Sequence, residues 1–376
     1  MSNVYVAGID MIKFGRYPDQ TPAELGAKAA LGALDDAGLT VHDIQAVYSS
    51  NLFHGMVGQG VMRLIGETGV PVTNVANACA SGATAVRDAW MAIKAGICDV
   101  VLAVGSEQMP RGMMETPNLK GPQPEGLFGS ISMPAVFAEI GMVHSAMYGT
   151  TFEQFAKVSV KNHHHSTMNE KAMYQVETPL EQVMNAEMIA YPNTKMMCSV
   201  NVDGAAAAIL VSEKKAKELG LSRMIKIRAS VLASTVYDPH SPSLFDINAP
   251  TRLAAKWAYE MAGAGPEDVD LIELHDCFAT AEILHYENLG ICADGEGGRL
   301  IDEGATALGG RVPVNVSGGL LSKGHPIGAT GIANIYEVAL HLRGEAGARQ
   351  VEGARLGLTH VLGFGTSVGI HILEKA

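Results

Sequence analysis

The chain repeats one strand–helix unit, and this internal duplication constrains its fold more than any other feature of the sequence. An Ala-rich segment over 21–38 ends in Gly38, as capped helices commonly do. A second Ala-rich segment, over 249–263, ends in Gly263 in the same way. Each segment leads into an acidic turn and a short apolar strand. We therefore expect two related halves joined in one chain.

The match continues along both halves. We expect a helix over 80–95 and a buried strand over 99–105 in the first half, and a helix over 328–343 and a strand over 358–363 in the second. Because strands alternate with helices, we predict mostly parallel sheets whose faces are covered by helices. The α/β class follows from this alternation.

An inserted region of different composition lies between the repeated units. We divide the chain into an N-terminal half over 1–117, an inserted loop or lid region over 118–222 and a C-terminal half over 223–376. The insert is rich in loop-forming residues and methionine, which suits an adaptable lid. Its histidine run, 163–165, lacks a carboxylate or thiol at metal-ligand spacing, so we expect a solvated helix face rather than a metal site.

Charge and hydropathy exclude several classes of partner. The chain has 27 Lys and Arg against 39 Asp and Glu, a net charge of −12, which disfavours nucleic acid and anionic lipid surfaces. No apolar run approaches the roughly 18–20 residues that span a bilayer. We therefore expect a cytoplasmic protein with no membrane segment. Five cysteines without Cys-x-x-Cys pairs support neither a disulfide framework nor a structural zinc site, which leaves free thiols for chemistry.

A cysteine motif lies between a strand and a helix of the first half. Asn77-Ala-Cys79-Ala-Ser-Gly82 places Cys79 at a helix N-terminus, where the helix dipole favours a thiolate and backbone N–H groups are free. Cys79 is therefore a candidate nucleophile. Taken alone, a cysteine in this position is more often a small buried apolar residue.

A glycine-rich turn in the second half presents one histidine. The segment 317–331 gathers glycines around His325 ahead of an Ala-rich helix, and we expect the turn to face the surface. His325 could activate a thiol or stabilise an oxyanion, although by itself it is better explained as a hydrogen-bonded turn histidine. A phosphate cradle does not fit, because the chain lacks a P-loop motif and the glycines at 363–369 are followed by no helix.

His275-Asp-Cys277-Phe ends a predicted strand of the second half. Titratable groups at a strand's carboxyl end suit a site at the open edge of a parallel sheet. A zinc site would need more ligands than His275 and Cys277 supply.

Four motifs in order carry a family resemblance: the cysteine motif at 77–82, His-Asp-Cys-Phe at 275–278, Gly-His-Pro-Ile-Gly-Ala-Thr-Gly at 324–331 and Gly-Phe-Gly at 363–365. Together they resemble the thiolase superfamily and, more narrowly, the thiolase domain of sterol-carrier-protein-x type enzymes. The resemblance implies a duplicated thiolase fold, a five-layer α/β/α/β/α body with an inserted loop or lid domain and the active site where the halves meet. It also implies a homodimer or homotetramer and allows a small OB-fold-type partner protein.

The resemblance assigns roles to individual residues. Cys79 matches the family's nucleophile and His325 its Gly-His-Pro histidine, while His275 stands where other thiolases have the Asn of an Asn-Glu-x-Phe motif. Most thiolases carry a second cysteine in a terminal Cys-x-Gly, which acts as acid and base. This chain has Gly363 there.

The loss of that second cysteine needs a replacement. Sequences of the sterol-carrier type share the loss and carry the His-Asp-Cys-Phe cysteine, so Cys277 is the natural acid and base. The backbone N–H groups of Cys79 and Gly365 would form the oxyanion hole.

The implied function is that of an acyl-CoA C-acyltransferase of the 3-ketoacyl-CoA thiolase or acetyl-CoA acetyltransferase type, working in lipid metabolism such as fatty acid β-oxidation. It would cleave 3-oxoacyl-CoA with CoA to acetyl-CoA or propionyl-CoA and a shortened acyl-CoA, or run the reverse Claisen condensation, through a cysteine acyl-enzyme. Coenzyme A is then a substrate, its binding residues are unassigned, and we expect no metal or other cofactor.

Three alternatives remain open. A thiolase-fold aldolase would generally lack the nucleophilic cysteine. A decarboxylating condensing enzyme would place a Cys-His-His or Cys-His-Asn set in different surroundings. The third is a non-catalytic acyl-CoA-binding subunit of a lipid-metabolising complex.

Overall fold

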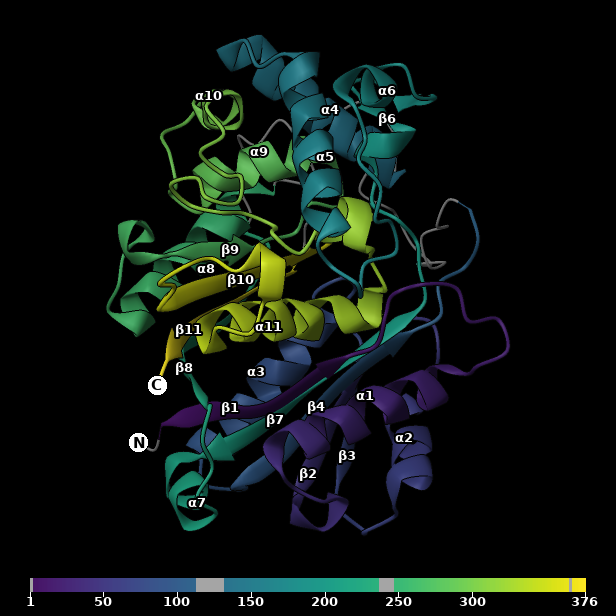
Figure 1. Ribbon diagram of the computed structural model, residues 1–376, viewed down its shortest axis with the longest axis vertical. Coiled ribbons are helices and arrows are strands. Elements are labelled where there is room, and N and C mark those ends of the chain that lie inside the picture. The colour runs from purple at the N-terminus through teal and green to yellow at the C-terminus, as the bar shows by residue number, and fades with distance from the viewer. Residues whose placement is uncertain (1–2, 113–131, 237–246, 365–366) are drawn as a thin grey trace.

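The computed structural model describes residues 3–112, 132–236, 247–364 and 367–376 (Figure 1). Helices and strands alternate in the first half as the sequence predicts. Their bounds are β1 (Val4–Met11), α1 (Pro22–Ala37), β2 (Ala46–Ser50), α2 (Val57–Ile65), β3 (Val72–Val75), α3 (Ser81–Lys94) and β4 (Val100–Glu107).

The second half follows a related path with more helix at its centre. Its elements are β8 (Ile225–Ser234), α8 (Asn248–Ala262), β9 (Leu271–Glu273), α9 (Ala279–Asn288), α10 (Gly297–Asp302), the π-helical turn η4 (Gly319–Lys323), α11 (Ile327–Arg343), β10 (Leu356–Gly363) and β11 (Ser367–Lys375). The segment 312–316, which matches β3 in the repeat, forms only an isolated bridge between Val314 and Ile272.

Between the halves lie three helices, a small hairpin and a further strand and helix: α4 (Met133–Tyr148), α5 (Phe152–Thr167), α6 (Leu180–Met184), β5 (Met188–Ala190), β6 (Asn193–Thr194), β7 (Gly204–Ser212) and α7 (Glu213–Glu218). Strand β7 pairs with β4 and β1, so the region 118–222 supplies a strand to the sheet of the first half. The domain boundaries at 117 and 222 stay a prediction.

The strands of the two halves form two groups that meet at β1 and β8. Their order is β3-β2-β4-β7-β1-β8-β11-β10-β9, and β1 joins β8 through two residue pairs, Tyr5 with Lys226 and Val6 with Ile225. This short antiparallel contact makes one continuous order out of two sheets.

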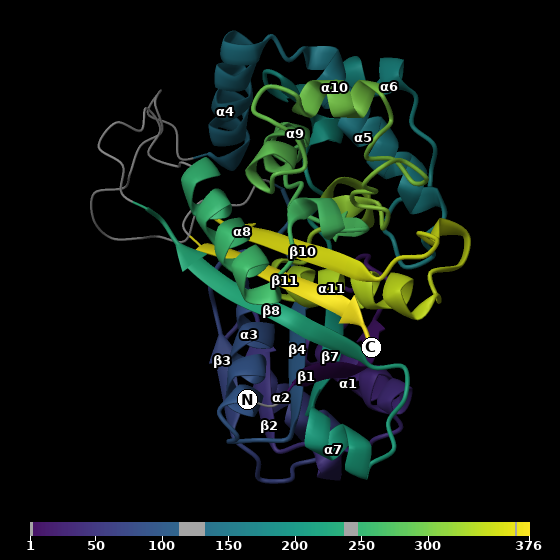
Figure 2. The same cartoon turned by 90° about the vertical axis from the view of Figure 1, so that its left-hand side faces the viewer.

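Helices α3 and α11 lie between the two groups of strands (Figures 1 and 2). They pack against each other, and α11 contacts β4 and β7 on one side and β9 and β10 on the other. Helix α1 covers the outer face of the first group, and α8 covers that of the second. The five-layer α/β/α/β/α fold predicted from the sequence is confirmed.

The prediction of mostly parallel sheets is wrong. In this sheet only β2 with β3, β2 with β4 and β9 with β10 are parallel, and the other five neighbouring pairs are antiparallel. The reason is the way each half closes. Strand β11 returns from β10 through a short connection, which can only give an antiparallel pair, and β7 enters the first group antiparallel to both of its neighbours.

The two Ala-rich repeats form helices for the reasons their sequences predict. The Thr21 side chain accepts a hydrogen bond from Glu24 N at the start of α1, and Gly38 ends the helix with a φ of 67°. Gly263 ends α8 in the same left-handed conformation, with a φ of 62°. Positive φ at both ends explains why each repeat closes on glycine.

The histidine run in α5 is helical, but two of its residues are not solvated. His163 and His165 are buried, and only His164 faces solvent. His165 contacts Asn315 O through Nδ1 at 3.0 Å and accepts from Leu308 N through Nε2 at 3.0 Å. The run therefore helps to fasten α5 to the second half. No helix within the described residues has the length and apolarity needed to cross a membrane.

Candidate active site

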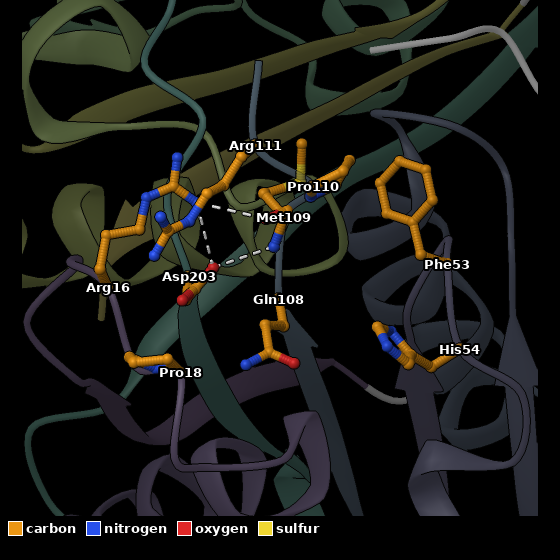
Figure 3. Close-up of a pocket in the computed structure, with 9 residues that line it drawn as sticks. All are labelled: Arg16, Pro18, Phe53, His54, Gln108, Met109, Pro110, Arg111 and Asp203. Atoms are coloured by element: carbon orange, nitrogen blue, oxygen red, sulfur yellow. Dashed lines mark hydrogen bonds and ion pairs between the residues drawn. The ribbon is translucent and has the colours of Figure 1, made fainter. Parts of the chain in front are cut away.

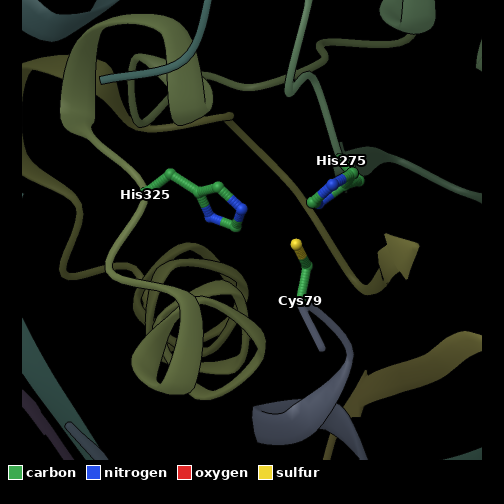
Figure 4. Close-up of side chains that lie close together, drawn as sticks. All are labelled: Cys79, His275 and His325. Atoms are coloured by element: carbon green, nitrogen blue, oxygen red, sulfur yellow. The ribbon is translucent and has the colours of Figure 1, made fainter. Parts of the chain in front are cut away.

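Cys79 lies on a sharp turn between β3 and α3. Ala78 adopts a φ of 48°, a conformation that side chains rarely take, and the Ser81 hydroxyl fixes the turn by accepting from Asn77 N and donating to Ala78 O. The turn aims the Cys79 sulfur at two imidazoles of the second half (Figure 4).

Burial controls the resting state of the Cys79 thiol. It raises the pKa to about 12, with a smaller rise from Glu107, although N–H groups of Cys79 and Phe364 lower it. The expected thiolate at a helix N-terminus is therefore outweighed, because desolvation exceeds the effect of the backbone donors. At neutral pH roughly one thiol in 10⁵ would be ionised, so the site needs a base.

His325 is the candidate for that base. It is 3% exposed, so the expectation of a surface-facing turn is wrong: α11 and the segment around Val200 enclose it. Because the Thr330 hydroxyl donates to Pro326 O, it accepts from His325 Nδ1 at 2.7 Å, which leaves the Nε2 lone pair free. Burial, and then Lys323, lower the pKa of His325 to about 3, so the ring is neutral.

His275 follows β9 and meets His325 edge to face, with ring centroids 5.1 Å apart. The sulfur of Cys79 and one nitrogen of each of these two rings all lie within 4.8 Å of one another. Burial, and then the neighbouring histidines, hold the pKa of His275 well below its usual range. Three residues that are remote in the sequence thus form one buried cluster.

The same cluster has the donor types of a metal site. One thiol and two imidazoles could hold an ion such as Zn²⁺, and they are the one such group found in the residues that the structure describes. The expectation that the protein uses no metal stays a prediction.

Cys277 lies beside this cluster, two residues after His275. It is 6% exposed, and its backbone carbonyl accepts from Ser199 N at 2.8 Å. Burial raises the pKa of its thiol well above the usual range, and the charge of Cys79 is the next largest cause, which places the two thiols near each other. Cys277 is therefore a candidate member of the site. Its role in proton transfer stays a prediction.

The terminal glycine motif borders Cys79 as well. A Cβ on Gly363 would lie 2.7 Å from Asn77 O, so the backbone packs too closely there for the second cysteine of other thiolases. Gly365, the expected oxyanion donor, lies outside the described residues. The N–H of Phe364, which the motifs did not indicate, interacts with the Cys79 sulfur.

Two buried carboxylates that sequence analysis missed hold the catalytic segments together. Asp276 accepts from Leu320 N at 2.7 Å and Leu321 N at 3.3 Å, and from the Asn162 side chain at 2.8 Å. It thereby ties the segment of His275 and Cys277 to η4, which leads to His325. Its place inside the His-Asp-Cys-Phe motif was the available signal.

Glu107 makes the corresponding link from the first half. Its carboxylate, at the end of β4, accepts from Leu52 N at 2.8 Å and from Gly328 N, in the first turn of α11, at 3.2 Å. Burial raises the pKa of Glu107 to about 7. A charged residue ending an apolar strand is the sequence signal that could have identified it.

Comparison with known proteins agrees with this geometry. Family models described as "Thiolase, N-terminal domain" and "Thiolase C-terminal domain-like" match residues 4–193 and 240–375, so the chain belongs to the thiolase family. The chain is 40% identical to an acetyl-CoA acetyltransferase of Methanothermobacter thermautotrophicus, with all of both chains covered. It is 37% identical to sterol carrier protein 2 of Homo sapiens over all of this chain and 72% of that protein.

A solved structure shows the same fold. The structure titled "Ltp2-ChsH2(DUF35) aldolase" superposes with a TM-score of 0.85 over 99% of this chain and 98% of that chain, at 24% identity. At this level of identity the likeness concerns the fold alone. The expected resemblance to sterol-carrier-type thiolases is confirmed by the sequence relatives.

Proposed function

We propose that the chain is a thiolase-type acyltransferase that cleaves 3-oxoacyl-CoA with CoA, or forms it by the reverse condensation, through an acyl-enzyme on Cys79. One observation carries this proposal: the Cys79 sulfur and the His275 and His325 nitrogens lie within 4.8 Å of one another in a buried site built from both halves. The named relatives with acyltransferase and sterol-carrier functions support it.

Acylation begins with a neutral thiol and a neutral imidazole. As the Cys79 sulfur attacks the 3-oxo carbon, its proton moves to the free Nε2 of His325, whose Nδ1–H stays bonded to Thr330. Backbone N–H groups of Cys79, Phe364 and Gly365 would surround the new oxyanion. One such donor is typically worth about 10²–10³ in rate.

Carbon–carbon cleavage then releases an enolate. The bond between the α and β carbons breaks, its electrons pass into acetyl-CoA or propionyl-CoA enolate, and the acyl group stays on Cys79. In this step we expect His275 and His325 to donate hydrogen bonds to the thioester oxygen and Cys277 to supply the proton to the α carbon. The sulfur of a second CoA then attacks the acyl-enzyme as its proton passes to the Cys277 thiolate, and His325 returns its proton to the Cys79 sulfur as that sulfur leaves.

The test is a panel of 3-oxoacyl-CoA substrates assayed for CoA-dependent cleavage, with acetyl-CoA, propionyl-CoA and the shortened acyl-CoA measured as products. Cleavage that requires CoA supports the thiolase reaction. An aldehyde or ketone product formed without CoA would instead indicate an aldolase, and acyl-CoA binding without turnover would indicate a binding subunit. The buried nucleophile beside two imidazoles favours the thiolase reaction over both.

The setting of the reaction belongs to the same proposal. We expect a homodimer or homotetramer, in the cytoplasm, acting in lipid metabolism such as fatty acid β-oxidation. A small OB-fold-type partner is compatible with the superposed aldolase, whose title names a DUF35 component. Light scattering of the purified chain, alone and after co-expression with candidate partners, measures these assemblies.

A further inference from the structure

A cavity of about 410 Å³ is lined by residues that follow β1, β2 and β4 of the first half and by Asp203 of the inserted region. It lies within the roughly 300–1,000 Å³ range of small-molecule sites. Figure 3 shows the side chains of Arg16 and Arg111 on one side, and Phe53 and His54 across from them. The lining comprises Arg16, Pro18, Phe53, His54, Gln108, Met109, Pro110, Arg111 and Asp203.

The cavity carries more positive than negative charge. Asp203 is its single acidic residue, and its carboxylate already accepts from Tyr17 N at 2.8 Å and Met109 N at 3.0 Å, with Arg16 at 3.5 Å. Arg111 forms no ion pair or hydrogen bond with any residue that the structure describes. Arg111 is thus a guanidinium that no described residue neutralises, in the same cavity as Arg16, and such a group favours binding of an anion.

One apolar residue, Met109, links the cavity lining with the candidate reaction centre. Met109 belongs to the same buried apolar cluster as Cys79 and Ile327, at the base of α11. Phe53, Pro18 and Pro110 also line the cavity. A chain of methylenes that starts at the Cys79 sulfur could follow Met109 and finish beside the guanidinium groups.

We propose that this cavity receives the far end of the acyl chain and that this end is a carboxylate, so that the substrates are 3-oxoacyl-CoA esters of dicarboxylic acids. The inference rests on the proposed thiolase function and names its substrate class. Arg111 and Arg16 bind the carboxylate, and Phe53 and Met109 contact the methylenes. A phosphate of CoA shares the anion's chemistry, but the mixed apolar and guanidinium lining fits a methylene chain ending in one charge better than the polar phosphate end of CoA.

The experiment compares two substrates of equal length, 3-oxoadipyl-CoA, which ends in a carboxylate, and 3-oxohexanoyl-CoA, which ends in a methyl group. For the wild-type chain we expect kcat/KM to be at least about tenfold higher for the carboxylated ester, as one charge-assisted contact provides. Arg111→Gln and Arg16→Gln should each bring this ratio close to one, and the ratio separates loss of carboxylate binding from a general loss of activity. Arg63→Gln, an exposed arginine of α2 that pairs with Glu67, is the matched control.

Arg16→Lys refines the result, because Arg16 also donates to Met109 O at 3.2 Å and so has a structural contact. Lysine keeps the positive charge but cannot bind a carboxylate through two N–H groups as a guanidinium does. We therefore expect Arg16→Lys to retain part of the preference for the carboxylated ester. If the wild-type ratio is near one, or if it survives both glutamine variants, the proposal is overturned.

Two further arms separate the alternatives. If the arginine variants lower activity only with normal CoA and not with 3′-dephospho-CoA, the cavity binds a CoA phosphate and the dicarboxylate assignment fails. Equilibrium binding of both esters to the wild-type chain tests the cavity independently of turnover. A binding preference for the carboxylated ester without cleavage would leave the cavity assigned and overturn the thiolase function alone.

Discussion

The two halves of the chain share a path but contribute different chemistry. The first half supplies a strained backbone turn with the Cys79 thiol and its own N–H, while the second supplies two neutral imidazoles, the Phe364 N–H and a neighbouring thiol. The active-site loop between β3 and α3 is short, whereas the corresponding loop before α11 rests on buried charged pairs such as Lys323 with Glu273. A duplicated scaffold thus keeps its layers, and its functions diverge in the loops at the element ends.

Removing the first half's thiol should have the largest effect. Cys79→Ala should lower turnover by at least about 10⁴-fold and abolish acyl-enzyme, because Cys79 is the proposed carrier of the acyl group. Mass spectrometry after incubation with acyl-CoA locates the adduct, and Cys98→Ala serves as the control from the same half. An adduct on Cys98, Cys198 or Cys292 would contradict the assignment.

Removing the second half's base should have the next largest effect. His325→Asn should lower kcat by at least about 10²-fold, since it eliminates the free Nε2 that accepts the Cys79 proton. Because the residue is buried, some loss of stability should accompany it, so kcat is referred to the folded fraction. His371→Asn, a buried histidine bonded to Ser230 at 3.0 Å, should cost stability without lowering kcat of that fraction. Full activity in folded His325→Asn would show that the imidazole is structural.

Cys277 tests whether the two halves carry different steps. Cys79 of the first half would carry the acyl group, and Cys277 of the second would exchange a proton with the enolate. Cys277→Ala should spare acylation of Cys79 by a simple acyl-CoA yet suppress exchange of the α protons of that acyl group in deuterated water. Cys198→Ala is the control, because the backbone of Cys198 forms a β-bridge with Phe278, next to Cys277. Exchange at the wild-type rate in Cys277→Ala would assign the proton to water or to His275.

Moving that thiol back to its usual family position is not an equivalent test. A cysteine at Gly363 would bring its Cβ within 2.7 Å of Asn77 O and 2.6 Å of Ser367 Oγ. Because Asn77 precedes the nucleophile's turn, such a variant would shift Cys79 itself. The loss of the second cysteine is therefore accompanied by close backbone packing around Gly363, and restoring the side chain alone would not restore the family's arrangement.

Weakening the link between catalytic segments should have a moderate effect. Asp276→Asn replaces a carboxylate surrounded by three N–H donors with an amide whose NH₂ faces one of them, so His275 and His325 should lose their relative placement. We expect kcat to fall about tenfold and hydrogen exchange to rise in η4. Asp302→Asn, at an exposed pair with Lys157, is the control. Unchanged kcat and exchange would show that the Asp276 contacts do not position the histidines.

Motifs indicated the reacting side chains, but their supports depend on the folded arrangement. The three candidate residues, Cys79, His275 and His325, lie at the ends of helices or strands in segments with distinct motifs. Such motifs can be recognised from the local sequence. Asp276 and Glu107 act on backbone N–H groups remote in the sequence, at separations that only packing brings together.

Burial was the property that sequence patterns predicted least well. A glycine-rich turn usually lies at a surface, yet His325 is covered by elements from elsewhere in the chain. The same enclosure raises the pKa of Cys79 although its helix N-terminus favours the opposite. The prediction of mostly parallel strands was wrong for a related reason, because the antiparallel pairing of β7 and β11 depends on how each half closes.

The smallest expected effect is a difference in acid stability between the halves. Burial lowers the pKa of His285, His325 and His341 to about 3 and that of His371 to about 4, all in the second half. These rings stay neutral when folded but gain a proton below about pH 6.5 when unfolded. Their contribution to stability is therefore complete above pH 6.5 and is lost as the pH falls from there to about 3. At pH 5.5 each ring would lower the free energy of unfolding by an amount on the order of 1 kcal/mol.

The first half should respond in the opposite direction, because the pKa of Glu107 is raised to about 7. Between about pH 7 and 4.5 this carboxyl takes up a proton more readily in the folded state, so acidification favours folding there. Hydrogen exchange by peptide mass spectrometry at pH 7.5 and 5.5, corrected for the intrinsic rates, should show α11 and β10 losing protection before β4 and α1. His371→Asn should reduce that difference, since it removes one of the titrating rings. If β4 and α1 open first, or both halves lose protection together, the buried histidines do not set the acid stability of the second half.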